Sequence, residues 1–555
     1  MPIIHFNNKE HLFHLLTQKA VVLTPNNRLS ESIIQQYFTH GESQTLDKPQ
    51  CMPYGIALIK AYEHLRFITP HVTHPTLLNA AQCQQLWRNL IKSKSNITFS
   101  EGLLQSIISA WERCQQWQIH PEDQTFHYTT QTRQFQQWWL LFEKRLKQQH
   151  LITEFQLIPY LLNANCCFFS QPIVWLCFDD FTPQQLSLQE YLDNKGLSQY
   201  QYDLKDKLSN TQVLAAQDSN EEYQQLMAWL HLKVAEGNHR IGVVVPNLEQ
   251  ESHAIQRMLT HHFAPEFFNI SLGEPLSHFS LVAHALSWLN LDDSYLNPHQ
   301  VNLLLQSPYL EGSKKEFLER SEYLQEANLL EKHIIPVKNL IEEFRNYAPI
   351  LAKLLSTLAP YPQVATIQEW IELFQERLNA LGFPGEYGLN SKNYQCINRF
   401  ITLFDELRQF ALLSSSFTKT EALETLAHLT DNTIFQAQKT NAPIQISGLL
   451  EASGCEFDSL WVVGLTDQCL PQKVHLSAFI PPQLQRDLHM PHSLPARELQ
   501  FARKIVQRLQ KSADSIIFSY AQLQGDNPNL PCSLITSFPK FELLPIYKEL
   551  LQNTD

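Results

Sequence analysis

Asn26, Asn27 and Arg28 lie where a nucleotide hydrolase would place its phosphate loop. They follow a short apolar run, Ala20–Leu23, and precede a helix-like stretch. A working loop has the pattern Gly-x-x-x-x-Gly-Lys-Ser/Thr, because its amides surround the phosphates while the lysine reaches the terminal ones. The turn has no glycine and no lysine, and side chains at the glycine positions block close backbone approach. The position of a phosphate site is present, but its chemistry is missing.

Two acidic residues, Asp179 and Asp180, directly follow the apolar run Ile173–Phe178. Carboxylates at the end of a buried strand can hold Mg²⁺ and activate an attacking water. Aspartate at position 180 reaches less far than glutamate, which disfavours proton abstraction from that water. Acidic residues also stabilise the N-terminus of a following helix, which we expect around Leu186. Without a phosphate-loop lysine, we favour this capping role.

The stretch Ile444–Leu534 carries the most specific pattern of the chain. Two apolar runs enclose a loop that contains Gly454, Glu456 and Asp458, and a helix and the strand-like run Ile516–Tyr520 follow. This loop resembles motif V of UvrD-type superfamily-one helicases, and the order of elements after it resembles the end of their second motor domain. The resemblance is closest to the AddB/RecC-like group of bacterial DNA-repair proteins, which often retain the helicase scaffold without its motor chemistry.

The resemblance implies a degenerate motor site. Working motors have a lysine before the motif V glycine, where this chain has Ser453. They also use an arginine to stabilise charge on the γ-phosphate, where this chain has Lys511, with Arg508 one turn earlier. We therefore expect no catalytic residue and no metal site, and ATP with Mg²⁺ only if the motor is active. The degenerate nucleotide-site positions are Asn26, Asn27, Arg28, Asp179, Asp180, Gly454, Glu456, Asp458 and Lys511.

The resemblance also implies an α/β fold with two RecA-like parallel-sheet cores of the P-loop NTPase type, each with a helical insertion. Continuous apolar runs predict central strands, buried on both faces, at Val21, Val174, Val243, Val462 and Ile517. The predicted parts are the first core at 1–75 and 166–236, its insertion at 76–165, the second core at 237–290 and 438–555, and its insertion at 291–437.

Several tryptophans lie in the first predicted insertion at helical spacing, among them Trp87, Trp111, Trp138 and Trp139. Such residues could stack on the bases of single-stranded DNA. Aromatic residues at this spacing more often pack a helical core, and we favour that interpretation.

Composition, charge and cysteine spacing limit the classes of protein to which the chain can belong. The 555 residues suffice for several domains, and the net charge of −13 argues against DNA binding through overall charge. No apolar run approaches the roughly 20 residues that span a bilayer, and no signal peptide is recognisable, so we expect a cytoplasmic protein without membrane association. The ten cysteines, including Cys166 and Cys167, form no Cys-x-x-Cys pair, which favours reduced thiols. His261-His262 has no Cys or carboxylate at ligand spacing, so we expect a surface pair.

The leading hypothesis is a helicase-derived scaffold of a bacterial repair or recombination system that binds single-stranded or forked DNA and positions it for a nuclease. A helicase or nuclease subunit is the expected partner. Arg28 and Arg240 are candidate DNA contacts because they flank strand ends, although ordinary surface charge explains them equally well. The related proteins usually continue into a PD-(D/E)xK nuclease domain, which we expect to be absent, since the nearest pattern is Asp203-Leu204-Lys205.

Two alternatives stay open. The first is an active ATP-dependent helicase with an unorthodox nucleotide site, built from Asp179 or Asp180 with Lys511. The second is a protein-interaction scaffold without a nucleic-acid role, which the acidic balance and the tryptophan-rich helices suit.

Overall fold

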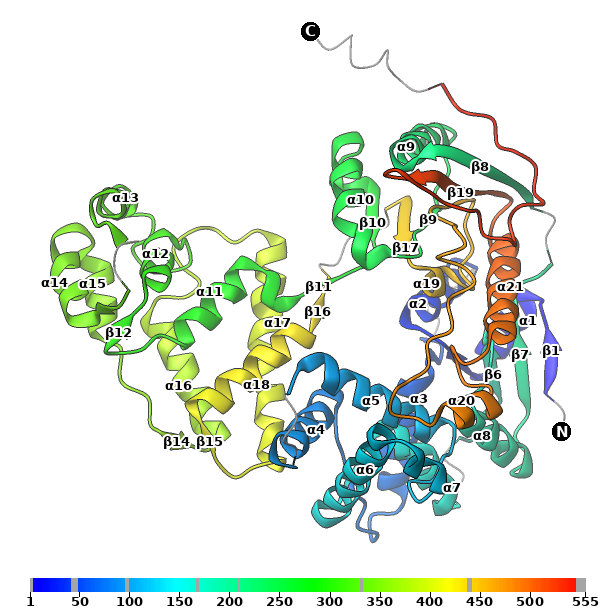
Figure 1. The fold of residues 1–555 in the computed structure, drawn as a ribbon, viewed down its shortest axis with the longest axis horizontal. Coiled ribbons are helices and arrows are strands. Elements are labelled where there is room, and N and C mark those ends of the chain that lie inside the picture. The colour runs from blue at the N-terminus through cyan, green and yellow to red at the C-terminus, as the bar shows by residue number, and fades with distance from the viewer. Residues whose placement is uncertain are drawn as a thin grey trace. The chain divides into compact units, whose positions relative to one another are not determined.

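The computed structural model describes residues 3–40, 48–94, 99–165, 169–206, 209–329, 333–436 and 442–545. The chain forms two compact units, of which unit 1 comprises Met1–Asn79, Trp87–Leu272 and Lys439–Asp555. Unit 2 comprises Ala80–Leu86 and Gly273–Gln438. The predicted α/β class is confirmed, because unit 1 contains two large, mainly parallel sheets with helices on their faces (Figure 1).

The first sheet of unit 1 has five parallel strands in the order β1-β7-β6-β2-β3. Its central strands β2 and β6 hold Val21 and Val174, both buried as predicted. Side chains of α1 and α2 pack on one face, and those of α3, α7 and α8 on the other. The elements are β1 (Ile4–Phe6), α1 (Lys9–Thr17), β2 (Val21–Thr24), α2 (Asn27–His40), β3 (Cys51–Pro53), α3 (Tyr54–Ile68), α7 (Leu157–Ala164), β6 (Ile173–Leu176), α8 (Pro183–Asn194) and β7 (Gln199–Tyr202).

The second sheet has six parallel strands in the order β10-β17-β9-β18-β19-β8, and β20 pairs antiparallel with the end of β19. Val243, Val462 and Ile517 lie buried in neighbouring strands of this one sheet. Helices α9 and α10 cover one face, while α19 and α21 cover the other. The elements are β8 (Asn210–Asp218), α9 (Ser219–Ala235), β9 (Ile241–Val244), α10 (Leu248–His262), β10 (Phe268–Ile270), β17 (Ile444–Ser447), α19 (Leu449–Ala452), β18 (Ser459–Val462), α20 (Pro482–Asp487), α21 (Pro495–Ser512), β19 (Ser515–Gln524) and β20 (Asn527–Pro528).

The boundary predicted at 236/237 falls elsewhere in the structure. We assigned 166–236 to the first core, but β8 pairs with β19 from Ser515↔Asn210 to Leu523↔Asp218, and α9 packs on the same sheet. The second sheet therefore begins at Asn210. Chain order misled the prediction, because the partner of β8 lies far downstream and pairing between distant strands leaves no local pattern.

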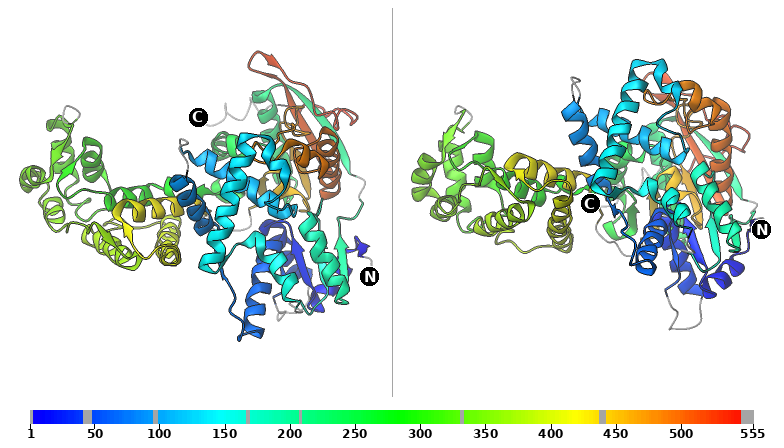
Figure 2. Two further views of the ribbon diagram at one scale, coloured as in Figure 1. Left: turned by 60° about the horizontal axis from the view of Figure 1, so that its bottom comes forward. Right: turned by 90° about the horizontal axis from the view of Figure 1, so that it is seen from below.

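The helices that follow Trp87 in unit 1 form a small bundle (Figure 2). Trp87 stacks on Phe142 with ring centroids 4.1 Å apart, and Trp111 packs edge-on against the same ring. The predicted packing role of the tryptophans is confirmed, since Trp87, Trp111, Trp138 and Trp139 are at most 1% exposed. The helices and the accompanying strand pair are β4 (Thr76–Leu77), α4 (Ala80–Lys94), α5 (Glu101–Gln116), α6 (Thr130–Gln149) and β5 (Leu151–Ile152).

One acidic residue of this bundle, Glu112, should make the free energy of unfolding depend on pH. Burial, with a smaller contribution from Glu154, raises the pKa of Glu112 to about 7 from an ordinary 4.5. The folded chain thus takes up this proton near neutral pH and the unfolded chain only near 4.5, so the free energy of unfolding should rise as the pH falls from about 8 to about 5. Urea titrations of Glu112→Gln should lack this rise, whereas the exposed Glu122→Gln should keep it. Identical profiles for the wild type and Glu112→Gln would contradict the assignment.

Unit 2 is mostly helical. The strand pairs among its described residues, β11–β16, β12–β13 and β14–β15, are short and antiparallel. The unit begins at Gly273 on the long segment, earlier than the 291 predicted for the second insertion. Its helices are α11 (Ser280–Leu289), α12 (Pro298–Gln306), α13 (Phe317–Glu326), α14 (Val337–Tyr347), α15 (Pro349–Ser356), α16 (Ile367–Ala380), α17 (Ser391–Arg408) and α18 (Lys419–Asn432). Its strands are β11 (Glu274–Pro275), β12 (Tyr295–Leu296), β13 (Ile335–Pro336), β14 (Val364–Ala365), β15 (Phe417–Thr418) and β16 (Ile434–Phe435).

Candidate functional site

The connection from β2 to α2 is too short to surround a phosphate. β2 ends at Thr24 and α2 begins at Asn27, so only Pro25 and Asn26 lie between them. Asn26 Oδ1 accepts a hydrogen bond from the Leu29 amide at 2.9 Å, and Asn26 Nδ2 donates to the Leu450 carbonyl at 3.3 Å. A phosphate loop needs several consecutive free amides that point inward. Here the turn instead joins α2 to α19, one of the helices that cover the second sheet.

Arg28 takes part in the same junction. Its Nη2 donates to Gln445 Oε1 on β17 at 3.0 Å, and the residue is half-buried. Asn27, by contrast, is exposed, and its carbonyl accepts a hydrogen bond from the Ser30 hydroxyl at 2.7 Å within α2. Arg28 therefore links α2 to β17, which leaves less of its guanidinium free for a ligand than the sequence suggested.

The predicted capping role of Asp179 and Asp180 is wrong, because Thr182 caps α8. The two acids, which follow β6, instead face three cations of α21. Arg508 Nη1 lies 2.7 Å from Asp179 Oδ1, and Lys504 Nζ lies 2.6 Å from Asp180 Oδ1. Arg497 Nη2 approaches Asp180 Oδ2 at 3.4 Å. The two carboxylates thus form ion pairs with cations that would otherwise attract an anionic ligand. We call these five residues the α21 ion cluster.

Within this cluster, burial has the largest effect on the pKa of Asp179. It raises the pKa of Asp179, while Arg508 acts in the opposite direction. Arg508 is 7% exposed in its side chain and also donates to the Cys177 carbonyl at 2.9 Å. Its Nε lies 3.4 Å from Asp203, the acid of the nuclease-like Asp-Leu-Lys pattern, which thereby has an ion-pair partner. Arg508, like Arg28, therefore reaches into the junction between the two sheets.

The sequence analysis expected Lys511 to stand in for the motor arginine. In the structure, Lys511 is not part of the α21 ion cluster. It pairs with the exposed Asp206 at 2.8 Å, one turn beyond Arg508. The sequence analysis also missed Arg497 and Lys504. Their spacing with Arg508, at i, i+7 and i+11, places all three on one helix face and could have identified them.

The motif V-like positions have separate structural roles. Gly454 has φ of +91°, and a Cβ there would lie 3.1–3.2 Å from Leu29 and Cys177, so a side chain at this position would be strained and crowded. Glu456 forms an ion pair with Lys9 of α1. Gly454 and Glu456 thus both join the loop after α19 to elements of the first sheet.

Asp458 and Arg240 lie together, away from the carboxyl ends of the strands. Asp458 Oδ2 accepts hydrogen bonds from the amides of His239 and Arg240, each at 2.9 Å. Arg240 directly precedes β9 and therefore lies at the amino end of that strand. Ligand clefts of α/β sheets open at carboxyl ends. The strand end that made Arg240 a candidate DNA contact is an amino end, whereas Arg28 does follow the carboxyl end of β2.

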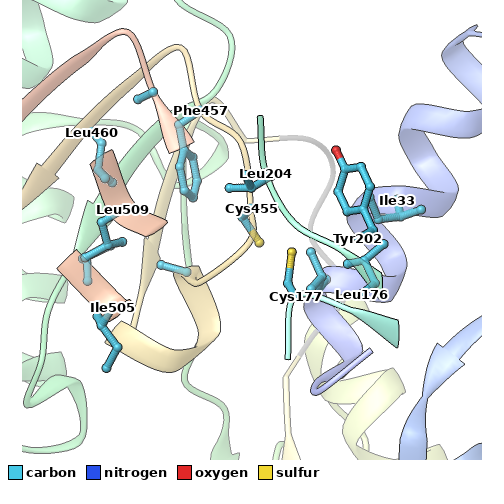
Figure 3. Packing of buried hydrophobic residues seen from close by; sticks show 14 of the residues in the cluster. Ile33, Leu176, Cys177, Tyr202, Leu204, Cys455, Phe457, Leu460, Ile505 and Leu509 are labelled. Atoms are coloured by element: carbon cyan, nitrogen blue, oxygen red, sulfur yellow. The ribbon is translucent and has the colours of Figure 1, made fainter. Parts of the chain in front are cut away.

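Apolar side chains close the rest of the junction. Figure 3 shows Leu176, Cys177 and Tyr202, which lie in or directly after strands of the first sheet, on one side of the junction. On the other side lie Cys455 and Phe457 of the loop that precedes β18. All five belong to one continuous buried cluster and are at most 4% exposed. Burial raises the pKa of the Cys177 thiol to about 12, so this cysteine stays protonated at neutral pH. The arrangement can hold the two sheets together.

Comparison with known proteins does not identify this chain. Neither the protein-family models nor the curated proteins contain a match. Within the described ranges, no group of three or more His, Cys, Asp or Glu side chains is arranged to hold a metal ion. The same part of the chain contains no helix long and apolar enough to cross a membrane. Cys166 and Cys167 lie outside the described residues.

Proposed function

We propose that this chain is a nucleotide-independent scaffold derived from a superfamily-one helicase and similar to the AddB/RecC-like repair proteins. In this proposal, the two parallel sheets of unit 1 are RecA-like cores that have lost their motor. The chain would act in the bacterial cytoplasm, bind single-stranded or forked DNA and position it for a nuclease or helicase partner. The resemblance of the motif V-like loop supports the origin, and the closed junction between the sheets supports the loss of the motor.

The α21 ion cluster is the observation that carries the proposal. A motor couples nucleotide binding to movement of one core against the other, and it needs free cations around the γ-phosphate. Here Arg497, Lys504 and Arg508 are already paired with the chain's own aspartates. The shared apolar cluster behind them favours one fixed arrangement of the two sheets.

We predict neither measurable ATP binding nor ATP hydrolysis. The two-residue turn of Pro25 and Asn26 offers no amide cradle, and the cations of the α21 ion cluster are already paired. Calorimetric titration with ATP and Mg²⁺ should show no heat of binding, and phosphate release should stay at background with DNA present. Asp180→Ala should behave like the wild type in both assays. DNA-stimulated turnover that disappears in Asp180→Ala would establish the alternative of an unorthodox motor.

We predict weak, salt-sensitive binding of single-stranded or forked DNA. The net charge of −13 opposes binding, so contacts must come from a local basic surface. Each neutralised phosphate should contribute a slope of about −0.7 to log K against log salt on a single strand. Fluorescence anisotropy at several salt concentrations, with blunt duplex as the control, measures this slope. Absence of binding at low salt would favour a protein-interaction scaffold.

A further inference from the structure

Helix α6, which belongs to the helical bundle of unit 1 (Figure 1), has one packed face and one exposed face. On the packed face, Phe142 contacts the rings of Trp87 and Trp111. The exposed residues include four cations, which are Arg133, Lys144, Arg145 and Lys147. Three and four turns of a helix take about 11 and 14 residues, so Arg133, Lys144 and Lys147 lie in one row along α6.

The positive charge of this row is not neutralised within the molecule. Within the described ranges, no carboxylate lies at ion-pair distance from any of the four cations of α6. Glu143 is the acid of α6, and its Oε1 accepts a hydrogen bond from Trp139 Nε1 at 2.7 Å. The cations of the α21 ion cluster, by contrast, are paired with aspartates. In a chain of net charge −13, the exposed row on α6 is therefore a local attractor for an anionic ligand.

An exposed aromatic ring lies next to this row. Tyr128, on the turn that precedes α6, is 78% exposed. Arg133 Nη2 donates to the carbonyl of the adjacent His127 at 2.7 Å, which holds the guanidinium near this turn. Proteins that bind single-stranded nucleic acid combine cations, which follow the phosphates, with aromatic rings, on which the bases stack. We call Tyr128 and the four cations of α6 the α6 basic face.

We propose that the α6 basic face binds the phosphates of single-stranded DNA and that Tyr128 stacks on an unpaired base. The inference rests on the proposed function and locates the local basic surface that DNA binding requires. Helix α6 has 20 residues, which span about 30 Å at about 1.5 Å per residue, so its row of cations is long enough to meet several successive nucleotides. An acidic protein segment would use the cations but has no base to stack on Tyr128.

Anisotropy titrations of the full chain with labelled oligothymidylate test the role of the cations. The triple variant Lys144→Gln, Arg145→Gln and Lys147→Gln should bind about tenfold or more weakly at low salt. The slope of log K against log salt should become shallower by about 2, because each neutralised phosphate contributes about 0.7 on a single strand. Glutamine is a good helix former and the three positions are exposed, so thermal unfolding should stay as in the wild type.

A matched control separates the α6 basic face from overall charge. The triple variant Lys338→Gln, Arg345→Gln and Lys353→Gln removes the same charge from exposed positions of unit 2. It should bind oligothymidylate like the wild type. Equal losses in the two triple variants would overturn the proposal, because they would show that total charge, rather than a particular surface, governs binding.

Tyr128 supplies a test that does not depend on charge. Tyr128→Ala should weaken binding of oligothymidylate several-fold and leave the salt slope unchanged, because stacking releases no counterions. Binding of blunt duplex should not change, since its bases are already stacked, and Tyr128→Phe should retain the affinity of the wild type. An unchanged affinity of Tyr128→Ala would overturn the stacking role.

The wild type distinguishes failure of this inference from failure of the proposed function. If the wild type does not bind oligothymidylate at low salt, the proposed DNA-binding function is wrong and this inference falls with it. If the wild type binds and the α6 triple variant binds equally well, DNA binding stands and only its assignment to the α6 basic face is wrong.

Discussion

Arg508→Ala should destabilise unit 1 by about 3–5 kcal/mol, because it leaves a buried charge without its partner. Arg508 pairs with Asp179 at 2.7 Å, and their side chains are only 7% and 14% exposed. The substitution also removes the hydrogen bond to the Cys177 carbonyl, which lies in the buried junction between the two sheets. Urea unfolding followed by tryptophan fluorescence measures the loss, and Arg508→Lys should recover only part of it, since lysine cannot bond several acceptors in one plane.

The pH dependence of this variant gives a second signature. Arg508 is the main group that lowers the pKa of Asp179, which burial already raises. Without Arg508, the folded carboxyl binds its proton at a still higher pH than the unfolded one, so stability should rise as the pH falls. The loss of stability of Arg508→Ala relative to the wild type should therefore become smaller as the pH falls from 7 to about 4.

Lys511→Ala is the matched control, because it removes a cation one turn away on the same helix. Its pair with Asp206 is exposed to solvent, and we expect little change in stability. Equal losses in the two variants would mean that helix α21 itself, rather than the α21 ion cluster, sets the stability of the junction.

Glu316→Ala should destabilise unit 2 by about 3–5 kcal/mol. Glu316 pairs with Arg320 at 2.9 Å, and the two side chains are 7% and 1% exposed. The carboxylate also accepts hydrogen bonds from the amides of Ile350 and Leu351 in the first turn of α15, so the variant loses a helix cap as well. The urea concentration at the midpoint of unfolding should fall for unit 2 and stay unchanged for unit 1.

Two further variants separate the causes of that loss. The exposed Glu319→Ala on α13 should have little effect, because it removes a charge without a buried partner. The double variant Glu316→Leu with Arg320→Leu should be more stable than Glu316→Ala, since it removes the buried unpaired cation. A double variant as unstable as the single one would show that the cap of α15, and not the ion pair, supplies most of the stability.

Periodicity in the sequence was enough to find the main strands. The five predicted central strands are parallel and buried, because a strand covered on both faces needs a continuous apolar run, which is visible locally. The tryptophans of the first insertion were assigned to a core by the same reasoning. Pairing between distant strands has no such signal, so the sequence analysis gave β8 to the wrong sheet.

Some features of the candidate site likewise follow from the sequence alone, while others depend on the tertiary structure. The sequence by itself determined that no glycine-rich phosphate loop follows β2, because that loop depends on residue types next to one another. Only the tertiary structure decided that Arg508, rather than Lys511, meets Asp179. It also placed Arg240 at an amino end. These outcomes depend on the relative position of helices and strands far apart in the chain, which packing fixes and local residue order does not record.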